Sequence, residues 1–236
     1  MWLNFKEWIK SYDFKWKFKL KVILPIILIL AIFDWVSKGV IAANMEQGEH
    51  KSFIDGFLGF IYTINPGSAY SINADKAWLA IILASVVTIL LLVLLVFINE
   101  KKILIGIAFI FAGSFANLLG RAWAPVVVGG AFAGQAGGVV DFLHWEFGFL
   151  NSESYIFNLA DTWVNIGIII MLLAIAYDII VYLITLFKKK PNSIDKTTDA
   201  VNSEVVLETE VKNNKLSNNK KSISKKSKIE SKNKEK

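Results

Sequence analysis

Two aspartates, Asp141 and Asp161, carry most of the chemistry that this sequence can offer. Each lies beside apolar residues, in Gly-Gly-Val-Val-Asp141 and in Phe-Asn-Leu-Ala-Asp161. Two carboxylates a few ångströms apart cannot both ionise cheaply, so they share one proton near neutral pH. The charged carboxylate can then activate a water molecule while the protonated one polarises a peptide carbonyl. Structural roles stay open as well: Asp161 precedes a long apolar run, where a helix N-cap would stand, and Asp141 suits a loop.

Other catalytic chemistries lack their residues. The chain has no cysteine, which excludes thiolate catalysis and disulfides. Two histidines, His50 and His144, are too few for a three-histidine zinc site, and no His-Glu-x-x-His motif is present. Neither histidine lies in an apolar run, as an intramembrane serine–histidine protease would need. A serine–lysine dyad of Ser71 with Lys38 stays open, although nothing in the sequence enforces it. We therefore expect no metal and no cofactor.

Long apolar runs must position the two aspartates. Hydrophobic residues make up 54% of the 236 residues, and they are concentrated in four runs. Each run approaches or exceeds the roughly 20 residues that cross a hydrocarbon core. The sequence therefore predicts an all-α integral membrane protein with four transmembrane helices, at about 22–43, 78–98, 103–119 and 162–187.

The distribution of lysine predicts the topology. Residues 1–21 hold six lysines, the turn 99–102 holds two, and residues 188–236 hold fourteen, whereas loops 44–77 and 120–162 are acidic. The positive-inside rule places both termini in the cytoplasm and both aspartates at the outer face of the membrane. Residues 1–21, which alternate aromatic residues with lysine, suit an anionic inner leaflet. The tail 188–236 is expected to be disordered and close to the membrane, without binding nucleic acid.

The outer loops contain the remaining structural signals. Residues 57–64 read as a strand that ends at the turn Asn65-Pro66-Gly67, so a small extracytoplasmic sheet is expected, because a strand cannot lie exposed in lipid. The Gly-rich link 122–138 predicts short strands or a flexible flap rather than a fifth span. Asp34 and Lys38 are four residues apart and share one helix face, which should point to the bundle interior or the outer interface.

Short blocks along the chain resemble lipoprotein signal peptidase, also called signal peptidase II. The resemblance extends from about Ile32 to Phe187, and its order and placement make it specific. The blocks are, in chain order, Asp34-Trp-Val-Ser-Lys38, Asn65-Pro-Gly67-Ser-Ala-Tyr-Ser71, Gly113-Ser-Phe-Ala-Asn117 with Arg121, Val139-Val-Asp141-Phe142 and Phe157-Asn158-Leu-Ala160-Asp161.

The resemblance implies a membrane aspartic peptidase over residues 22–187, with a small β-cradle and a short surface helix. It would remove the signal peptide of a diacylglyceryl-modified prolipoprotein just before the lipidated cysteine, with Asp141 and Asp161 as the catalytic pair. Its partners would be these substrates and membrane lipids, and we expect a monomer. The residues implied to bind substrate or support the pair are Asp34, Lys38, Asn65, Gly67, Asn117, Arg121, Phe157 and Asn158.

Three features depart from the family pattern. The family has an aspartate before the arginine, where this chain has Gly120, so Arg121 is expected to lack a local ionic partner. The link from Arg121 to Asp141 is longer than usual, and both basic ends of the chain are extra. Two alternative functions also stay open. One is a small transporter or channel that uses Asp34, Lys38 and Asp178 as a polar pathway, and the other is a non-catalytic membrane protein that binds lipoproteins.

Overall fold

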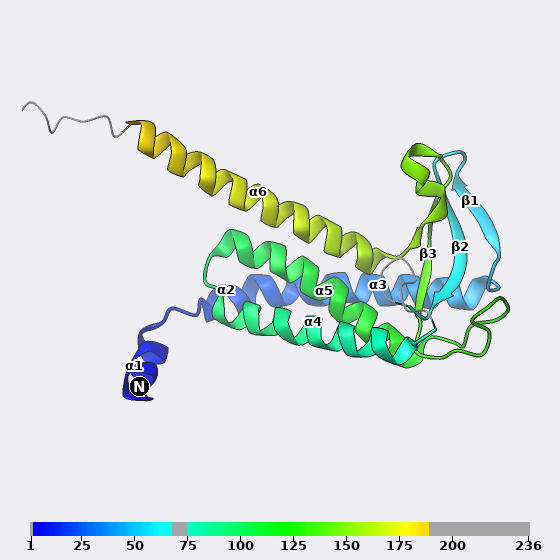
Figure 1. Cartoon of the computed structure of the whole chain (residues 1–236), viewed down its shortest axis with the longest axis horizontal. Coiled ribbons are helices and arrows are strands. Elements are labelled where there is room, and N and C mark those ends of the chain that lie inside the picture. The colour runs from blue at the N-terminus through cyan, green and yellow to red at the C-terminus, as the bar shows by residue number, and fades with distance from the viewer. Residues whose placement is uncertain (1, 68–74, 189–236) are drawn as a thin grey trace, which may run out of the picture. The chain divides into compact units, whose positions relative to one another are not determined.

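A computed structural model describes residues 2–67 and 75–188 (Figure 1). Four helices in this part of the chain are long and apolar enough to cross a membrane, and a small sheet accompanies them. The prediction of four apolar helices and a small sheet is therefore confirmed. The four candidate spans are Trp16–Asn44, Ala77–Phe97, Lys101–Trp123 and Leu159–Lys188.

The elements follow one another along the chain in a simple order. The first span contains three of them, and the helix α1 precedes it. The elements are α1 (Trp2–Ser11), α2 (Trp16–Phe18), the π-helix η1 (Lys19–Ile23), α3 (Leu24–Asn44), β1 (His50–Ile54), β2 (Leu58–Asn65), α4 (Ala77–Phe97), α5 (Lys101–Trp123), β3 (Val139–Trp145), the 3-10 helix η3 (Phe149–Ser154), β4 (Ile156–Phe157) and α6 (Leu159–Lys188).

Helix α5 lies at the centre of the helical core. It packs against α3 and α4, and its inner face is fully or almost fully buried at Leu104, Ile107, Ala108, Ala112 and Ala116. Long apolar side chains on α3, α4 and α6 are exposed instead. Because soluble proteins rarely expose apolar patches of this extent, these faces require lipid.

Glycines allow α5 and α6 to approach closely. A Cβ atom added at Gly113 would lie 2.2 Å from the carbonyl oxygen of Ala160, and one added at Gly167 would lie 2.6 Å from that of Gly106. Real Cβ atoms never come so close to backbone oxygen, so no larger residue fits either position. Small residues of this kind are the usual means by which membrane helices pack. The close contact at Gly113 therefore determines where along α5 the first turn of α6 lies.

The sheet has four antiparallel strands in the order β1-β2-β3-β4. Strand β2 pairs with β3 along Asn65↔Val139 and Thr63↔Asp141, and the register shifts between Phe60 and Thr63. Strand β3 contacts both α3 and α5 (Figure 1). A second core cluster joins the sheet to the helices: its buried members are Ile41, Tyr62, Ile64, Val140 and Phe142, with Leu159 packed against them. This cluster places β3 beside the first turn of α6.

The Gly-rich link between α5 and β3 contains no strand, so of the two alternatives, short strands or a flexible flap, the short strands were wrong. Val127 donates its N–H to the carbonyl of Gln135, and Gly134 donates back to the carbonyl of Val127, both at 2.9 Å. Gly129, Gly130 and Gly134 have positive φ angles, which L-residues with a Cβ rarely adopt. The backbone therefore closes on itself in a turn.

Two predictions fall outside the described residues. Ser71 lies in the segment 68–74, and the predicted tail is described only at Lys188. Residues up to Ile179 form one compact unit, and Ile180–Lys188 are the last described turns of α6, where the apolar side chains are exposed. The site below lies wholly in the first unit.

Candidate active site

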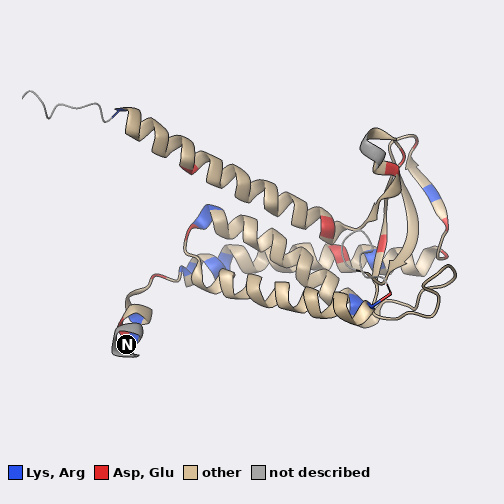
Figure 2. Ribbon diagram, viewed as in Figure 1, with Lys and Arg blue, Asp and Glu red and all other residues tan. Residues whose placement is uncertain are grey.

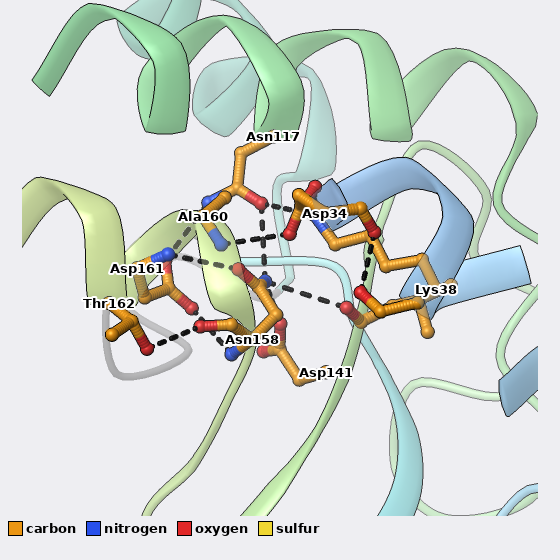
Figure 3. Close-up of polar contacts among 10 residues, drawn as sticks. Asp34, Lys38, Asn117, Asp141, Asn158, Ala160, Asp161 and Thr162 are labelled. Atoms are coloured by element: carbon orange, nitrogen blue, oxygen red, sulfur yellow. Dashed lines mark hydrogen bonds and ion pairs between the residues drawn. The ribbon is translucent and has the colours of Figure 1, made fainter. Parts of the chain in front are cut away.

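Strand β3 holds Asp141 in a buried position at the helical end of the sheet. Its side chain is 4% exposed. Asn65, at the end of β2, donates its side-chain amide to Oδ2 of Asp141 at 3.1 Å, and Asn158 donates to Oδ1 at 2.6 Å. Figure 3 shows this carboxylate facing Asn158. Both oxygens of Asp141 are thus held by amide donors from different elements.

Asp161 lies in the first turn of α6, but it is not the N-cap. The helix begins at Leu159, so Asn158 is the N-cap and Asp161 is the third helical residue. The N–H of Asp161 donates to Oδ1 of Asn158, and the N–H of Asn158 donates to Oδ2 of Asp161, both at 3.0 Å. This reciprocal pair is a capping box, which satisfies two N–H groups that a helix start leaves open. The N-cap interpretation of Asp161 was therefore wrong by three residues.

Asn158 links the two aspartates. Its side-chain amide donates to Asp141 and also to Oδ1 of Asn117, at 3.1 Å, while its backbone N–H donates to Asp161. Asn158 is buried, and the hydroxyl of Thr162 donates to its carbonyl at 3.1 Å. One residue therefore orients both carboxylates (Figure 3).

A buried ion pair supports Asp161 from the other side. Lys38 Nζ donates to Asp34 Oδ2 and to Asn117 Oδ1, both at 2.7 Å, and Asn117 Nδ2 donates to Asp161 Oδ1 at 2.9 Å. The second oxygen of Asp34 accepts the N–H of Ala160 at 2.8 Å. Asp34 and Lys38 are fully buried, so the pair faces the bundle interior. Asp34 thereby satisfies another open N–H of α6, and Lys38 orients Asn117.

Arg121 binds backbone rather than carboxylates. Its Nη1 donates to the carbonyl of Gly137 at 3.0 Å and its Nη2 to that of Gly67 at 2.6 Å. Its Nε is buried and has no hydrogen-bond partner among the described residues. Arg121 thus ties the turn after β2 to the end of the Gly-rich link, beside the aspartate pair. Neither an interfacial anchor nor a cation paired with the carboxylates fully describes Arg121, because its hydrogen bonds go to backbone carbonyls.

Gly120 lies on α5 near Lys38 of α3. A Cβ atom added at Gly120 would lie 3.8 Å from Lys38 Nζ and 3.9 Å from Val139 Cγ1. Successive helical residues do not face each other, so an aspartate at this position would approach Lys38. The effect of Gly120 on the ionic surroundings of Arg121 stays a prediction.

Phe157 lies on the sheet next to these polar groups. It belongs to β4, opposite Leu143 of β3, and its ring lies 5.4 Å from the ring of Trp145. This aromatic contact fixes β4, which leads directly into Asn158. Phe157 therefore positions the start of α6 through its packing.

Burial and charge control the protonation of Asp141. Burial raises the pKa of Asp141, and the nearby charge of Asp161 raises it further, to about 7. Hydrogen bonds from Asn65 and Asn158 and the charge of Lys38 act in the opposite direction. Near neutral pH, this carboxyl therefore takes up or releases its proton easily. A pair in this state can supply one acid and one base.

The structure brings all ten predicted site residues into one region, but the sequence reasoning missed Gln47. Gln47 Nε2 donates to the carbonyl of Val126 at 2.9 Å, and its Oε1 accepts the N–H of Val128 at 2.8 Å. The side chain thus clamps the Gly-rich link, whose last residues bind Arg121. A single glutamine in a loop carries no sequence signal for this role. The capping box, in contrast, has a signal in the sequence, which is the spacing Asn-x-x-Asp.

No metal-binding group accompanies the pair in the described ranges. Within residues 2–67 and 75–188, no three His, Cys, Asp or Glu side chains come together in a way that could hold a metal ion. The polar groups around the aspartates are amides, one lysine and one arginine.

Known proteins resemble this chain over its membrane-spanning part. The sequence profile of the family described as Signal peptidase (SPase) II matches residues 26–177. A lipoprotein signal peptidase of Streptococcus agalactiae is 34% identical over 158 residues, which cover 66% of this chain and 92% of that protein. One of Fusobacterium nucleatum is 33% identical over 149 residues, which cover 61% of this chain and 80% of that protein.

A solved structure agrees with the sequence matches. A bacterial membrane enzyme, determined by the in meso method at 2.3 Å resolution, has 26% sequence identity and a TM-score of 0.56. The match covers 66% of this chain and 88% of that chain. The profile spans well over half of the chain and includes all the site residues named above. Together with the four apolar helices, these matches show that the chain belongs to the signal peptidase II family of membrane peptidases.

Proposed function

We propose that this protein is a membrane aspartic endopeptidase that removes the signal peptide from diacylglyceryl-modified prolipoproteins by cleaving just before the lipidated cysteine. The observation that carries the proposal is the joint orientation of Asp141 and Asp161 by Asn158. The names of the relatives, lipoprotein signal peptidases, support the substrate class.

The surroundings of the two aspartates suggest their roles. Asp161 accepts the backbone N–H of Asn158 at the start of α6, where the helix dipole stabilises an anion, and the side-chain amide of Asn117, so it is the ionised member. Asp141, with a pKa of about 7, is the protonated member. Asp161 takes a proton from water as the water oxygen attacks the scissile carbonyl carbon, and Asp141 donates its proton to the carbonyl oxygen. Collapse of the tetrahedral intermediate returns that proton to Asp141, and Asp161 passes its proton to the leaving nitrogen.

The position of the pair suits a substrate that is held at a membrane surface. Asp161 lies at the start of one apolar span, and Asn117 and Arg121 lie near the end of another. A lipidated cysteine would be held at that depth by its acyl chains. The excess of lysine at the opposite ends of the spans supports an extracytoplasmic site with both termini in the cytoplasm. We propose a monomer as the functional unit.

The described ionisable side chains of the spans do not suggest a transport pathway. Asp34, Lys38 and Asp161 gather in one network. Asp178 instead forms an ion pair with Lys102 at the start of α5. A pore would need polar groups at several depths between these two clusters. The geometry therefore favours the peptidase over the channel.

Mutation of the pair tests the proposal directly. The protein is expressed with a lipid-modified prolipoprotein, and precursor and mature forms are separated on a gel. We expect Asp141→Asn and Asp161→Asn to abolish processing, because either change removes the acid or the base. Asp178→Asn is the matched control on the same helix and should process normally. Normal processing by both site variants would overturn the aspartic mechanism.

A further inference from the structure

The first 25 residues precede the range that the family profile matches. They include α1, α2 and η1, and residues 1–21 hold six lysines against Glu7 and Asp13. We propose that this N-terminal segment is a docking surface for a leaflet rich in anionic phospholipid. Its lysines bind headgroup phosphates, and its exposed aromatic and aliphatic side chains enter the boundary with the acyl chains. The proposal is independent of the chemistry of the aspartate pair.

The segment is attached to the end of α4. The last carbonyls of a helix have no partner within it, and α4 ends at Phe97. The hydroxyl of Tyr12 donates to the carbonyl of Phe97, and Lys19 Nζ donates to that of Val96 at 2.6 Å. A cation at a helix C-terminus is also favoured by the helix dipole. These bonds hold the segment where the apolar run of α4 gives way to the polar turn before α5.

Aromatic rings strengthen the attachment at the same depth. The ring of Phe97 lies 6.4 Å from that of Trp8, in a stacked arrangement, and 6.1 Å from that of Phe14. Phe14 in turn lies 4.8 Å from Tyr12 and 5.8 Å from Trp16. Aromatic residues gather at the boundary between hydrocarbon and headgroups. This cluster therefore holds α1 close to the headgroup layer.

The outward side of the segment combines apolar and cationic groups. Trp16 is 51% exposed and Leu20 is 59% exposed. Lys17 and Lys21 directly follow these two residues and are exposed, as are the lysines at positions 6 and 10 of α1. This combination is typical of a segment that lies in a membrane interface, because lysine stems cover apolar surface while their ammonium groups reach phosphate. Charge and exposure thus point to the same partner.

Neighbouring charges leave this cationic surface largely intact. Asp13 pairs with Lys15, and Asp178 pairs with Lys102 at the start of α5, so these pairs cancel locally. Lys101 lies 5.4 Å from the ring centre of Phe18 and adds a positive charge beside the segment. Figure 2 shows the blue of Lys and Arg along α1, at the start of the first span and at the start of α5. An anionic leaflet is the surface that this arrangement fits.

Because the chain has no cysteine, one introduced cysteine is the only position that a thiol-reactive fluorophore can label. Full-length protein with Ile9→Cys, at an exposed position of α1, is labelled with an environment-sensitive fluorophore and reconstituted in vesicles. The vesicles contain phosphatidylcholine alone or with phosphatidylglycerol, and a nitroxide-labelled lipid serves as quencher. We expect a blue shift and stronger quenching in the anionic vesicles, with both effects reduced by salt.

Lysine variants identify the source of the effect. Lys6→Gln and Lys10→Gln in the labelled protein should each lower the ratio of docked to undocked segment about fivefold. Lys51→Gln and Lys76→Gln, outside the segment, remove the same charge and should leave the ratio unchanged. Equal quenching in neutral and anionic vesicles, or no response to loss of Lys6 and Lys10, would overturn the proposal. Prolipoprotein processing by the same variants checks that the four spans remain folded.

Discussion

Asn158 and Asp161 hold each other at the start of α6, where the backbone N–H of each donates to a side-chain oxygen of the other at 3.0 Å. This contact orients Asp161 before any substrate is bound. Because Asn158 also donates to Asp141, the local geometry of a helix cap is transmitted to the second carboxylate. The same contacts of Asn158 therefore cap α6 and align the two aspartates.

Replacement of Asn158 should separate these two effects. Asn158→Ser keeps an oxygen that can cap α6 but loses the amide that binds Asp141, so we expect processing to fall about 100-fold with little loss of stability. Asn158→Ala removes the cap as well and should also cost about 1 kcal/mol of stability. Thr162→Ala, which loses only a hydroxyl bond to the Asn158 carbonyl, is the control. Cleavage rates and thermal unfolding in detergent give the two readouts.

The pKa of Asp141 predicts a loss of activity above neutral pH. Burial and the charge of Asp161 raise this pKa to about 7, so the proton of the acid is lost as the pH rises through that value. We expect kcat/KM to decline with an apparent pKa near 7. The hydrogen bond from Asn65 opposes the increase in pKa, so Asn65→Leu should move the decline to higher pH. A decline that stays in place in this variant would contradict the assignment.

The same pKa predicts how stability depends on pH. The proton on Asp141 is bound more tightly in the folded protein than in the unfolded chain, because the pKa is raised from 3.8 to about 7. This contribution to stability is complete below about pH 3.8 and is lost as the pH rises towards 7. Asp141→Asn removes the titrating group. Between pH 4 and pH 7, its melting temperature should fall less with rising pH than that of the wild type.

Removing one charge of the Asp34–Lys38 pair should lower the stability of the protein more than removing both charges. Lys38→Met leaves Asp34 buried without its cation and should destabilise the protein by about 3 to 5 kcal/mol. Asp34→Asn together with Lys38→Met removes both charges and should recover part of that loss. Asn117 loses its lysine donor in both variants, so processing should fall in both. Unfolding and processing measured on the two variants would show whether stability and activity separate in this way.

Two glycines on α5 offer a matched comparison. Gly113→Ala places a methyl group 2.2 Å from the carbonyl oxygen of Ala160, whereas Gly120→Ala meets nothing closer than 3.8 Å. Since backbone cannot move aside as a side chain can, Gly113→Ala should cost about 1 to 3 kcal/mol. It should also displace Asp161 and reduce processing. Gly120→Ala should resemble the wild type in both assays, and equal effects of the two changes would contradict the packing described here.

Much of the architecture could be predicted from local patterns. The four apolar runs predict four spans because only helices satisfy their own backbone in lipid, and the run before Asn65 predicts β2 because strand and turn residues have strong local preferences. The order of the short blocks also indicated which polar residues would meet. The spacing of three residues between Asn158 and Asp161 is also a local signal for the capping box, although Asp161 was interpreted as the N-cap.

Contacts between distant residues could only come from the tertiary structure. Asp34 binds the N–H of Ala160 across 126 positions, Arg121 binds two loop carbonyls, and Gly120 faces Lys38. Each depends on how one helix is rotated against another, which close packing at Gly113 and Gly167 determines. Hydropathy is nearly uniform around a lipid-facing helix, so it specifies a span but not its rotation. The sequence by itself determined that four helices can cross a membrane and which polar residues they carry. Only the packing of the helices decided which atoms those polar residues contact.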